Sequence, residues 1–145
     1  ISVAQLLPGA EILVVTTPQT AAAEVAERTG LIAAQTHQKV AGVIENMSYM
    51  SQPDGSRLEI FGSGGGTIVS ASLSETLGYE VPLLAQLPLD IRLREGSDTG
   101  RPTTVADDGK PAADAPAALE LSAVAQRLTR RARGLAGKSL GVTPA

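Results

Sequence analysis

The most informative polar side chain in this sequence is Asn46, which lies two residues beyond a short apolar run at residues 40–44. Such a run is typical of a buried parallel strand, and ligands of open α/β sheets bind just beyond the carboxyl ends of strands. A side-chain amide presents one acceptor and two donors in one plane, which suits the edge of a nucleotide base. We therefore expect Asn46 to contact a base, with a cap on its own backbone as the alternative.

Two proline-containing segments follow other apolar runs. They are Thr17-Pro18-Gln19, after the run at 11–16, and Pro88-Leu89-Asp90, after the run at 81–87. A proline restricts the backbone around it, so each segment is either the end of a strand or a rigid wall beside a ligand. Arg94 stands one helical turn after Asp90, so it could reach a ligand beside that segment. The alternative is that Arg94 is an ordinary solvated charge.

A glycine cluster at Gly62 and Gly64 to Gly66 has no lysine after it, so it is not a lysine-containing phosphate loop. Its N–H groups could hold an anion at a helix N-terminus, but a hinge or a close packing contact is the favoured explanation. His37 is the single histidine and cysteine is absent, so no metal site and no Ser-His-Asp set is predicted.

The elements that must position these residues alternate between strands and helices, which is typical of βαβ units. Strands are expected at 11–16, 40–44 and 81–87 with a short strand at 57–61, and helices at 22–36, 64–77 and 115–133 with a helical turn at 90–95. In the first helix, the spacing places Val25 and Ile32 on the core face and Gly30 off it. The predicted fold is α/β, a three-layer, mostly parallel sheet with helices on both faces.

Composition narrows the class of protein. The 145 residues fit one domain, and the net charge of −3 does not favour nucleic acid as a partner. The sequence shows no apolar run of membrane-spanning length and no signal peptide, and the absence of cysteine is compatible with the cytoplasm. Residues 2–7 are typical of the last turns of a helix. Because residue 1 is Ile and falls inside this expected helix, the chain is interpreted as a fragment.

Four motifs in order carry a family resemblance: VVTTPQ, GVIENMS, FGSGGG and VPLLAQLPLDIRLREGSDTGRP. Over residues 1–125 the chain resembles the Mrp/ApbC family of P-loop ATPases, which are iron–sulfur cluster carriers related to MinD. The resemblance covers the carboxyl-terminal half of that domain. It predicts residues 1–113 as the second half of an ATPase domain, 114–133 as its last helix and 134–145 as a disordered tail.

The resemblance implies ATP with Mg²⁺ as cofactor of the full-length protein, a cytoplasmic homodimer, and iron–sulfur apo-proteins as partners. Asn46 corresponds to the base-recognising asparagine of the family. The segment Pro88-Leu89-Asp90 corresponds to the backbone that lies against adenine and ribose, with Arg94 in reach of the ribose. The loop around Pro18 corresponds to one near the γ-phosphate and the subunit interface.

The chain departs from the family in two ways that matter for function. It contains no G-x-x-x-x-G-K-[ST] loop, so we expect no ATP hydrolysis by residues 1–145 alone. The family's Cys-x-x-Cys interval holds Ser51, Gln52, Pro53, Asp54 and Ser56. Because cluster iron prefers thiolates, a cluster on this chain is doubtful. The alternatives are a non-catalytic MinD-like module for dimerisation or partner binding, and a MinD-like partitioning ATPase.

Overall fold

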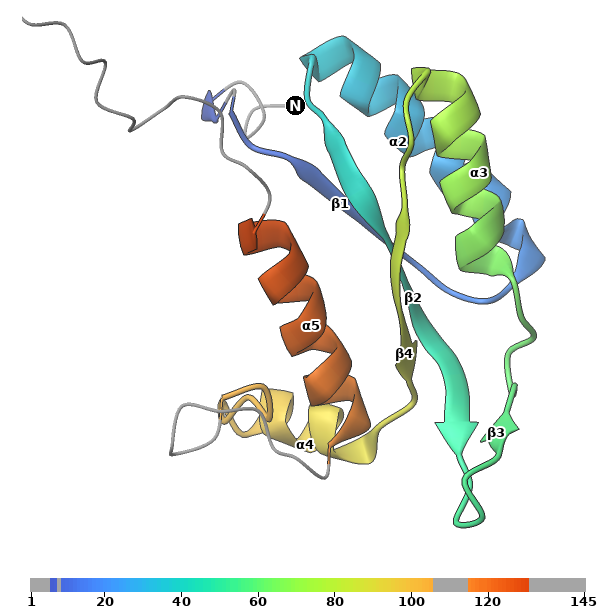
Figure 1. Cartoon of the computed structure of the whole chain (residues 1–145), viewed down its shortest axis with the longest axis vertical. Coiled ribbons are helices and arrows are strands. Elements are labelled where there is room, and N and C mark those ends of the chain that lie inside the picture. Colours follow the sequence, from blue (N-terminus) through green and yellow to red (C-terminus); the bar gives the residue numbers. More distant parts are fainter. Residues whose placement is uncertain (1–5, 8, 106–114, 131–145) are drawn as a thin grey trace, which may run out of the picture.

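The computed structural model describes residues 6–7, 9–105 and 115–130, and it forms a four-stranded sheet with helices on both faces (Figure 1). In chain order the elements are β1 (Ile12–Thr16), η1 (Thr20–Ala22), α2 (Ala23–Thr36), β2 (Val40–Ser51), β3 (Arg57–Leu58), α3 (Gly65–Leu77), β4 (Leu83–Pro88), α4 (Ile91–Asp98) and α5 (Pro116–Arg130). β2 lies between β1 and β4 and is parallel to both, while β3 pairs antiparallel with the end of β2. The predicted α/β class and mostly parallel sheet are confirmed.

β2 is longer than its apolar run predicts, because the strand continues past Ile44 through a bulge. The register of β2 against β4 shifts between Glu45 and Tyr49, and Met47 has a left-handed φ of 58°. Beyond the bulge, Tyr49 pairs with Pro88. The prediction that the chain leaves the strand after Ile44 is therefore wrong, since the alternation of side chains does not reveal a bulge.

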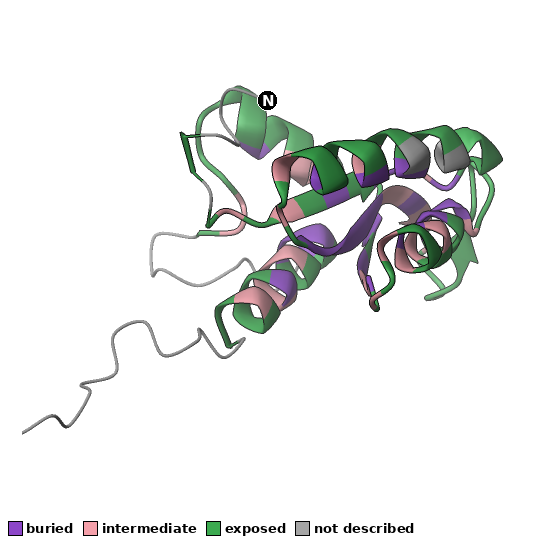
Figure 2. Cartoon of the chain, turned by 90° about the horizontal axis from the view of Figure 1, so that it is seen from above, coloured by how far each residue is buried: buried purple, intermediate pink, exposed green. Residues whose placement is uncertain are grey.

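The helices α2 and α3 cover one face of the sheet, and the largest core cluster lies beneath them. Val14, Val43, Val69 and Leu73 are buried in this cluster. Figure 2 shows the buried residues gathered between the sheet and the helices, with exposed residues on the outer helix surfaces. Buried apolar residues on both sides of a strand are the expected pattern for a parallel sheet.

The buried face of α2 agrees with the predicted one only in part. Ala26 and Ala33, which the same spacing places on the core face, are buried, but so is Gly30, whereas Val25 and Ile32 are 39% and 46% exposed. A Cβ on Gly30 would lie 3.2 Å from Cγ2 of Thr76, so the missing side chain lets α2 and α3 approach closely. The prediction for Val25, Ile32 and Gly30 is wrong because contact between helices, rather than the most apolar stripe, decides this face.

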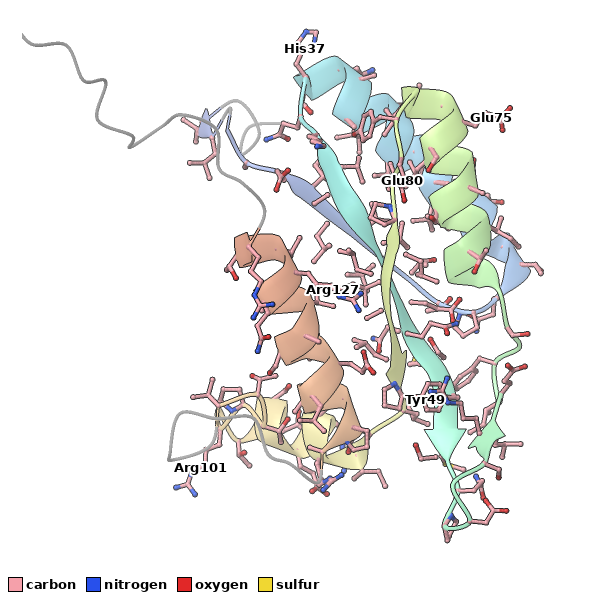
Figure 3. All side chains as sticks on the ribbon, viewed as in Figure 1. His37, Tyr49, Glu75, Glu80, Arg101 and Arg127 are labelled. Atoms are coloured by element: carbon pink, nitrogen blue, oxygen red, sulfur yellow. The ribbon has the colours of Figure 1, made fainter. Side chains whose placement is uncertain are left out.

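On the opposite face, α5 packs over β4 and β2, where Ile44, Leu87 and Val124 form a second cluster. Arg127 of α5 donates from Nη1 to the main-chain oxygen of Leu84 in β4 at 2.7 Å, and Figure 3 shows its side chain directed toward the sheet. The same face of β1 is uncovered within the described residues, because Leu13 and Val15 are 38% and 57% exposed there.

The predicted helix boundaries agree with the structure where it describes them. Gly78, with a φ of 71°, caps α3 as expected, and α4 extends the predicted turn at 90–95 to Asp98. Residues 106–114 and 131–133 and the predicted tail at 134–145 lie outside the described residues. Within the described residues, no helix is long and apolar enough to cross a membrane.

Candidate functional site

A cavity of about 270 Å³ lies where the bulge of β2 faces the end of β4, the loop after it and the helix α4. We call it the amide cavity. Its lining includes five of the six predicted site residues, Asn46, Pro88, Leu89, Asp90 and Arg94. Met47, Leu93 and Ser97 complete it. The bulge of β2 and the strand end of β4 thus bring together residues that are more than 40 positions apart in the sequence.

The side chain of Asn46 already has a local role in this cavity. Its Oδ1 accepts a hydrogen bond from the main-chain N–H of Met47 at 2.9 Å, which supports the left-handed backbone of Met47. The backbone cap that was the alternative for Asn46 is therefore present. Its Nδ2 makes no hydrogen bond to any described residue, so Asn46 can act on a ligand as a donor.

The loop after β4 is held firmly against β2. The N–H of Leu89 donates to the main-chain oxygen of Tyr49 at 2.7 Å, and Pro88 is buried and paired with Tyr49. Since proline also fixes its own φ, this loop has little freedom to move away from the cavity. It forms a rigid wall opposite Asn46.

Asp90 serves as the N-cap of α4. Its Oδ1 accepts from the main-chain N–H of Arg92 at 3.0 Å and from the Nε of Arg92 at 3.3 Å. The side chain is only 8% exposed, and its Oδ2 is buried without a donor among the described residues. A buried acceptor left unpaired is unfavourable, so this oxygen would gain from a donor brought to the start of α4.

Arg94 lies at the rim of the amide cavity, as predicted from its place one turn after Asp90. Its side chain is 70% exposed, and its Nη2 is 3.5 Å from Oε1 of Glu95. An exposed pair of this length holds the guanidinium weakly. The charge is therefore free to turn toward a ligand in the cavity.

A larger cavity of about 420 Å³ lies on the other side of the same wall. It shares Pro88, Leu89 and Asp90 with the amide cavity, and Met50 and Pro116 also line it. The sequence does not predict this cavity, because Met50 lies beyond the bulge and Pro116 belongs to a helix that packs there only through the tertiary fold.

The glycine cluster is a close packing contact, which is one of the two explanations favoured from the sequence. The N–H of Gly65 donates to the main-chain oxygen of Pro18 at 3.1 Å, and a Cβ on Gly65 would collide with the main-chain oxygen of Thr17. The structure thus places the buried Pro18 against the start of α3, outside the lining of the amide cavity. The glycines bring the end of β1 next to α3.

Glu45 is a site residue that the sequence analysis missed. It is 1% exposed, and its Oε2 accepts the N–H of Gly66 at 2.6 Å. The anion at this helix start is therefore the chain's own carboxylate. The available signal was an acidic residue inside the apolar strand, directly before Asn46.

The turn that replaces the expected cysteine interval is closed by its own side chains. Asp54 accepts from the N–H of Ser56 at 2.9 Å and from the hydroxyl of Ser56 at 2.6 Å. The hydroxyl, and then the N–H, lower the pKa of Asp54 below its ordinary value. Nearby, the guanidinium of Arg57 lies 4.1 Å from the ring centre of Tyr49. No group of three or more metal-ligating side chains occurs within the described ranges.

Comparison with known proteins gives a family match and curated relatives that agree with each other. The ParA family, described as NUBPL iron-transfer P-loop NTPase, matches residues 1–128. The "Iron-sulfur cluster carrier protein" of Mycobacterium leprae is 56% identical over 99% of this chain, and that of Mycobacterium tuberculosis H37Rv is 52% identical over 99%. The chain spans 36% of the length of each of these relatives.

A solved nucleotide-binding protein from Archaeoglobus fulgidus, in complex with ADP, is 33% identical to the chain with a TM-score of 0.42. The match covers 54% of this chain and 30% of that one.

Proposed function

This chain belongs to the ParA/NUBPL family of iron-transfer P-loop NTPases, and on that premise we propose that the protein containing it binds and hydrolyses ATP with Mg²⁺ and carries iron–sulfur clusters as a cytoplasmic homodimer. The residues present here supply the base pocket and part of the dimer face. The observation that carries the proposal is the amide cavity, in which the free donor of Asn46 faces the fixed wall of Pro88 and Leu89.

The chemistry of the amide cavity suits a purine base. Adenine offers ring-nitrogen acceptors beside an amino donor, and the Nδ2 of Asn46 donates while its Oδ1 is occupied by Met47. The cavity of about 270 Å³ is smaller than the ~300–1,000 Å³ of pockets that hold whole ligands. It therefore fits the base, with the ribose and phosphates outside it and within reach of Arg94.

The phosphates and Mg²⁺ require residues that this chain does not contain. Backbone N–H groups and a lysine of a P-loop surround the phosphates in this class of enzyme, and a serine or threonine binds Mg²⁺. No such loop occurs in residues 1–145. We expect residues 1–145 alone to release no phosphate from ATP above a protein-free blank, and measurable release would contradict this division of roles.

The iron–sulfur cluster is the cargo in this proposal, and the donor set of the 51–56 turn does not fit it. Cluster iron is held by thiolates, whereas Asp54 is engaged by Ser56 and the remaining groups are hydroxyls and an amide. Cysteines outside residues 1–145 would have to hold the cluster. After anaerobic reconstitution of residues 1–145, stoichiometric iron with a charge-transfer band would contradict this.

A homodimer has support from apolar side chains in β3 and directly after it. Leu58, Ile60 and Phe61 are 49%, 47% and 37% exposed. Burying such a surface against a second copy or an apo-protein would be favourable. The same observation also supports the alternative, a non-catalytic dimerisation or partner-binding module. ATP hydrolysis by the natural full-length protein would exclude that alternative, and light scattering on the same protein measures the oligomeric state.

The test of the nucleotide proposal uses Asn46→Asp in the natural full-length protein. Aspartate keeps an oxygen for the N–H of Met47 but removes the donor. We expect the Kd for a fluorescent adenosine nucleotide to rise about tenfold or more, because a lost hydrogen bond is worth roughly 1–2 kcal/mol. Gln35→Ala removes an exposed amide on α2 and should leave the Kd unchanged. Equal binding by Asn46→Asp and the wild type would overturn the proposed site.

A further inference from the structure

Glu45 is a buried carboxylate with both oxygens engaged by groups from distant parts of the chain. Its Oε2 accepts from the N–H of Gly66 at the start of α3, at 2.6 Å. Its Oε1 accepts from Nε2 of Gln86 in β4 at 2.8 Å. Burying a carboxylate is unfavourable unless it has such hydrogen-bond partners. The two bonds therefore account for an acidic residue in the interior of this strand.

The contact between Glu45 and α3 leaves no space for a side chain on the helix. A Cβ on Gly66 would lie 2.7 Å from the Cβ of Glu45 and 3.0 Å from its Oε2. One residue earlier, Gly65 is bonded to Pro18 at the end of β1. The carboxylate of Glu45 therefore links β2 and β4 to the start of α3. The segment that follows β1 contacts the same helix start.

Glu45 and Asn46 are consecutive in β2, so their side chains leave opposite faces of the strand. The side chain of Glu45 binds α3 on one face, while Asn46 lines the amide cavity on the other. The hydroxyl of Ser48 donates to the main-chain oxygen of Glu45 at 2.9 Å and closes the bulge around Met47. The contacts of Glu45 thus determine the position of the bulge. They thereby also determine the position of the Asn46 amide.

We propose that Glu45 is a positioning residue for the amide cavity: its carboxylate fixes the β2 bulge against Gly66 and Gln86 and thereby holds the amide of Asn46 in the geometry that binds the base. The expected effect of Glu45 on nucleotide affinity rests on the proposed nucleotide site. Its effect on the bulge itself does not depend on any ligand.

The donor–acceptor pattern around Glu45 permits a sharp test. Both neighbours, the N–H of Gly66 and the Nε2 of Gln86, are donors, so both need an acceptor. Glu45→Gln offers one oxygen and one NH₂ group, which leaves one of these donors facing another donor. Adding Gln86→Glu restores the match. The new carboxylate at residue 86 accepts from the NH₂ group of the glutamine at residue 45, and the side-chain oxygen of that glutamine accepts from the N–H of Gly66.

The experiment compares Glu45→Gln, Gln86→Glu and the double variant in the natural full-length protein. Glu75→Gln, the same chemical change at an exposed position of α3, is the matched control. Figure 3 shows Glu75 pointing away from the sheet. The measurements are the Kd for a fluorescent adenosine nucleotide and the hydrogen-exchange rates of the amides of Met47 and Gly66. Thermal unfolding accompanies them.

We expect Glu45→Gln to weaken nucleotide binding about tenfold and to speed exchange at both amides, with recovery to within about threefold in the double variant. A folded Glu45→Gln protein with unchanged exchange at Met47 would overturn the positioning role. So would a double variant that recovers the melting temperature but not the exchange rate. If the wild type binds no nucleotide, the proposed function fails, and exchange at Met47 still decides the role of Glu45.

Discussion

The bulge of β2 at residues 45–48 and the turn at residues 52–56 lie close together along the chain but are held in opposite ways. In the bulge, Glu45 is buried and bound to groups 21 and 41 residues away. In the turn, Asp54 is exposed, and within the part of the chain that the structure describes its side chain bonds only to Ser56, two residues away. The first segment depends on the tertiary fold, whereas the second is closed by local contacts.

This difference suits the two segments to different roles. A segment fixed from several sides suits a binding site that must keep its shape, because preorganised donors lose little freedom when the ligand arrives. A turn held only by neighbours can change sequence without disturbing the sheet. The exposed residues Ser51, Pro53 and Asp54 can therefore be substituted with little effect on the sheet.

The largest expected effect comes from filling the contact between the bulge and α3. Gly66→Ala places a Cβ 2.7 Å from the Cβ of Glu45, so α3 must move and the bond to Glu45 is lost. We expect the free energy of unfolding to fall by about 3 kcal/mol, measured by urea denaturation. Thr67→Ala, the next residue on α3 and exposed, is the control. A similar small change in both variants would contradict the tight contact.

A smaller effect is expected when one internal bond of the bulge is removed. Ser48→Ala deletes the buried hydroxyl that donates to the main-chain oxygen of Glu45 at 2.9 Å. We expect a loss of about 1 kcal/mol in unfolding free energy. Ser51→Ala removes an exposed hydroxyl at the end of the same strand and should change it by less than ~0.5 kcal/mol. Equal effects at the two serines would show that the bulge is no better fixed than the exposed end of the strand.

The smallest effect is expected in the turn, and it depends on pH. The folded pKa of Asp54 is lowered by the hydroxyl and N–H of Ser56, so its ionised form is favoured in the folded state. This contribution is present above the ordinary pKa of the carboxyl and is lost as the pH falls through the lowered value. Asp54→Ala should therefore lower Tm slightly at neutral pH and not at pH ~2.

The matching control for this prediction is Ser56→Ala, which removes the hydroxyl donor. NMR titration should then show the pKa of Asp54 moving back up toward its ordinary value. An unchanged pKa in Ser56→Ala would mean that the side chains of the turn do not hold it closed.

The sequence predicted the parts of the fold that depend on local pattern. The short apolar runs at the parallel strands and the glycine stop at Gly78 are local signals, and both agree with the structure. Asn46 and Pro88 were placed together by recognisable motifs around two apolar runs, and both line the amide cavity. That they contact a nucleotide stays a prediction.

The missed features depend on contacts between distant residues. Glu45 has no local pattern, since its partners are known only once α3 and β4 are placed beside β2. The bulge at Met47 interrupts the alternation that marks a strand. Gly30 faces the core because α3 approaches it there, which the periodicity of α2 alone does not show.

A structure of the natural full-length protein with ADP tests the central claim most directly. We expect a purine ring between Asn46 and the Pro88–Leu89 wall, with Nδ2 of Asn46 at about 2.7–3.2 Å from a ring nitrogen. A base bound elsewhere, with the amide cavity unchanged and Asn46 bonded only to Met47, would contradict it.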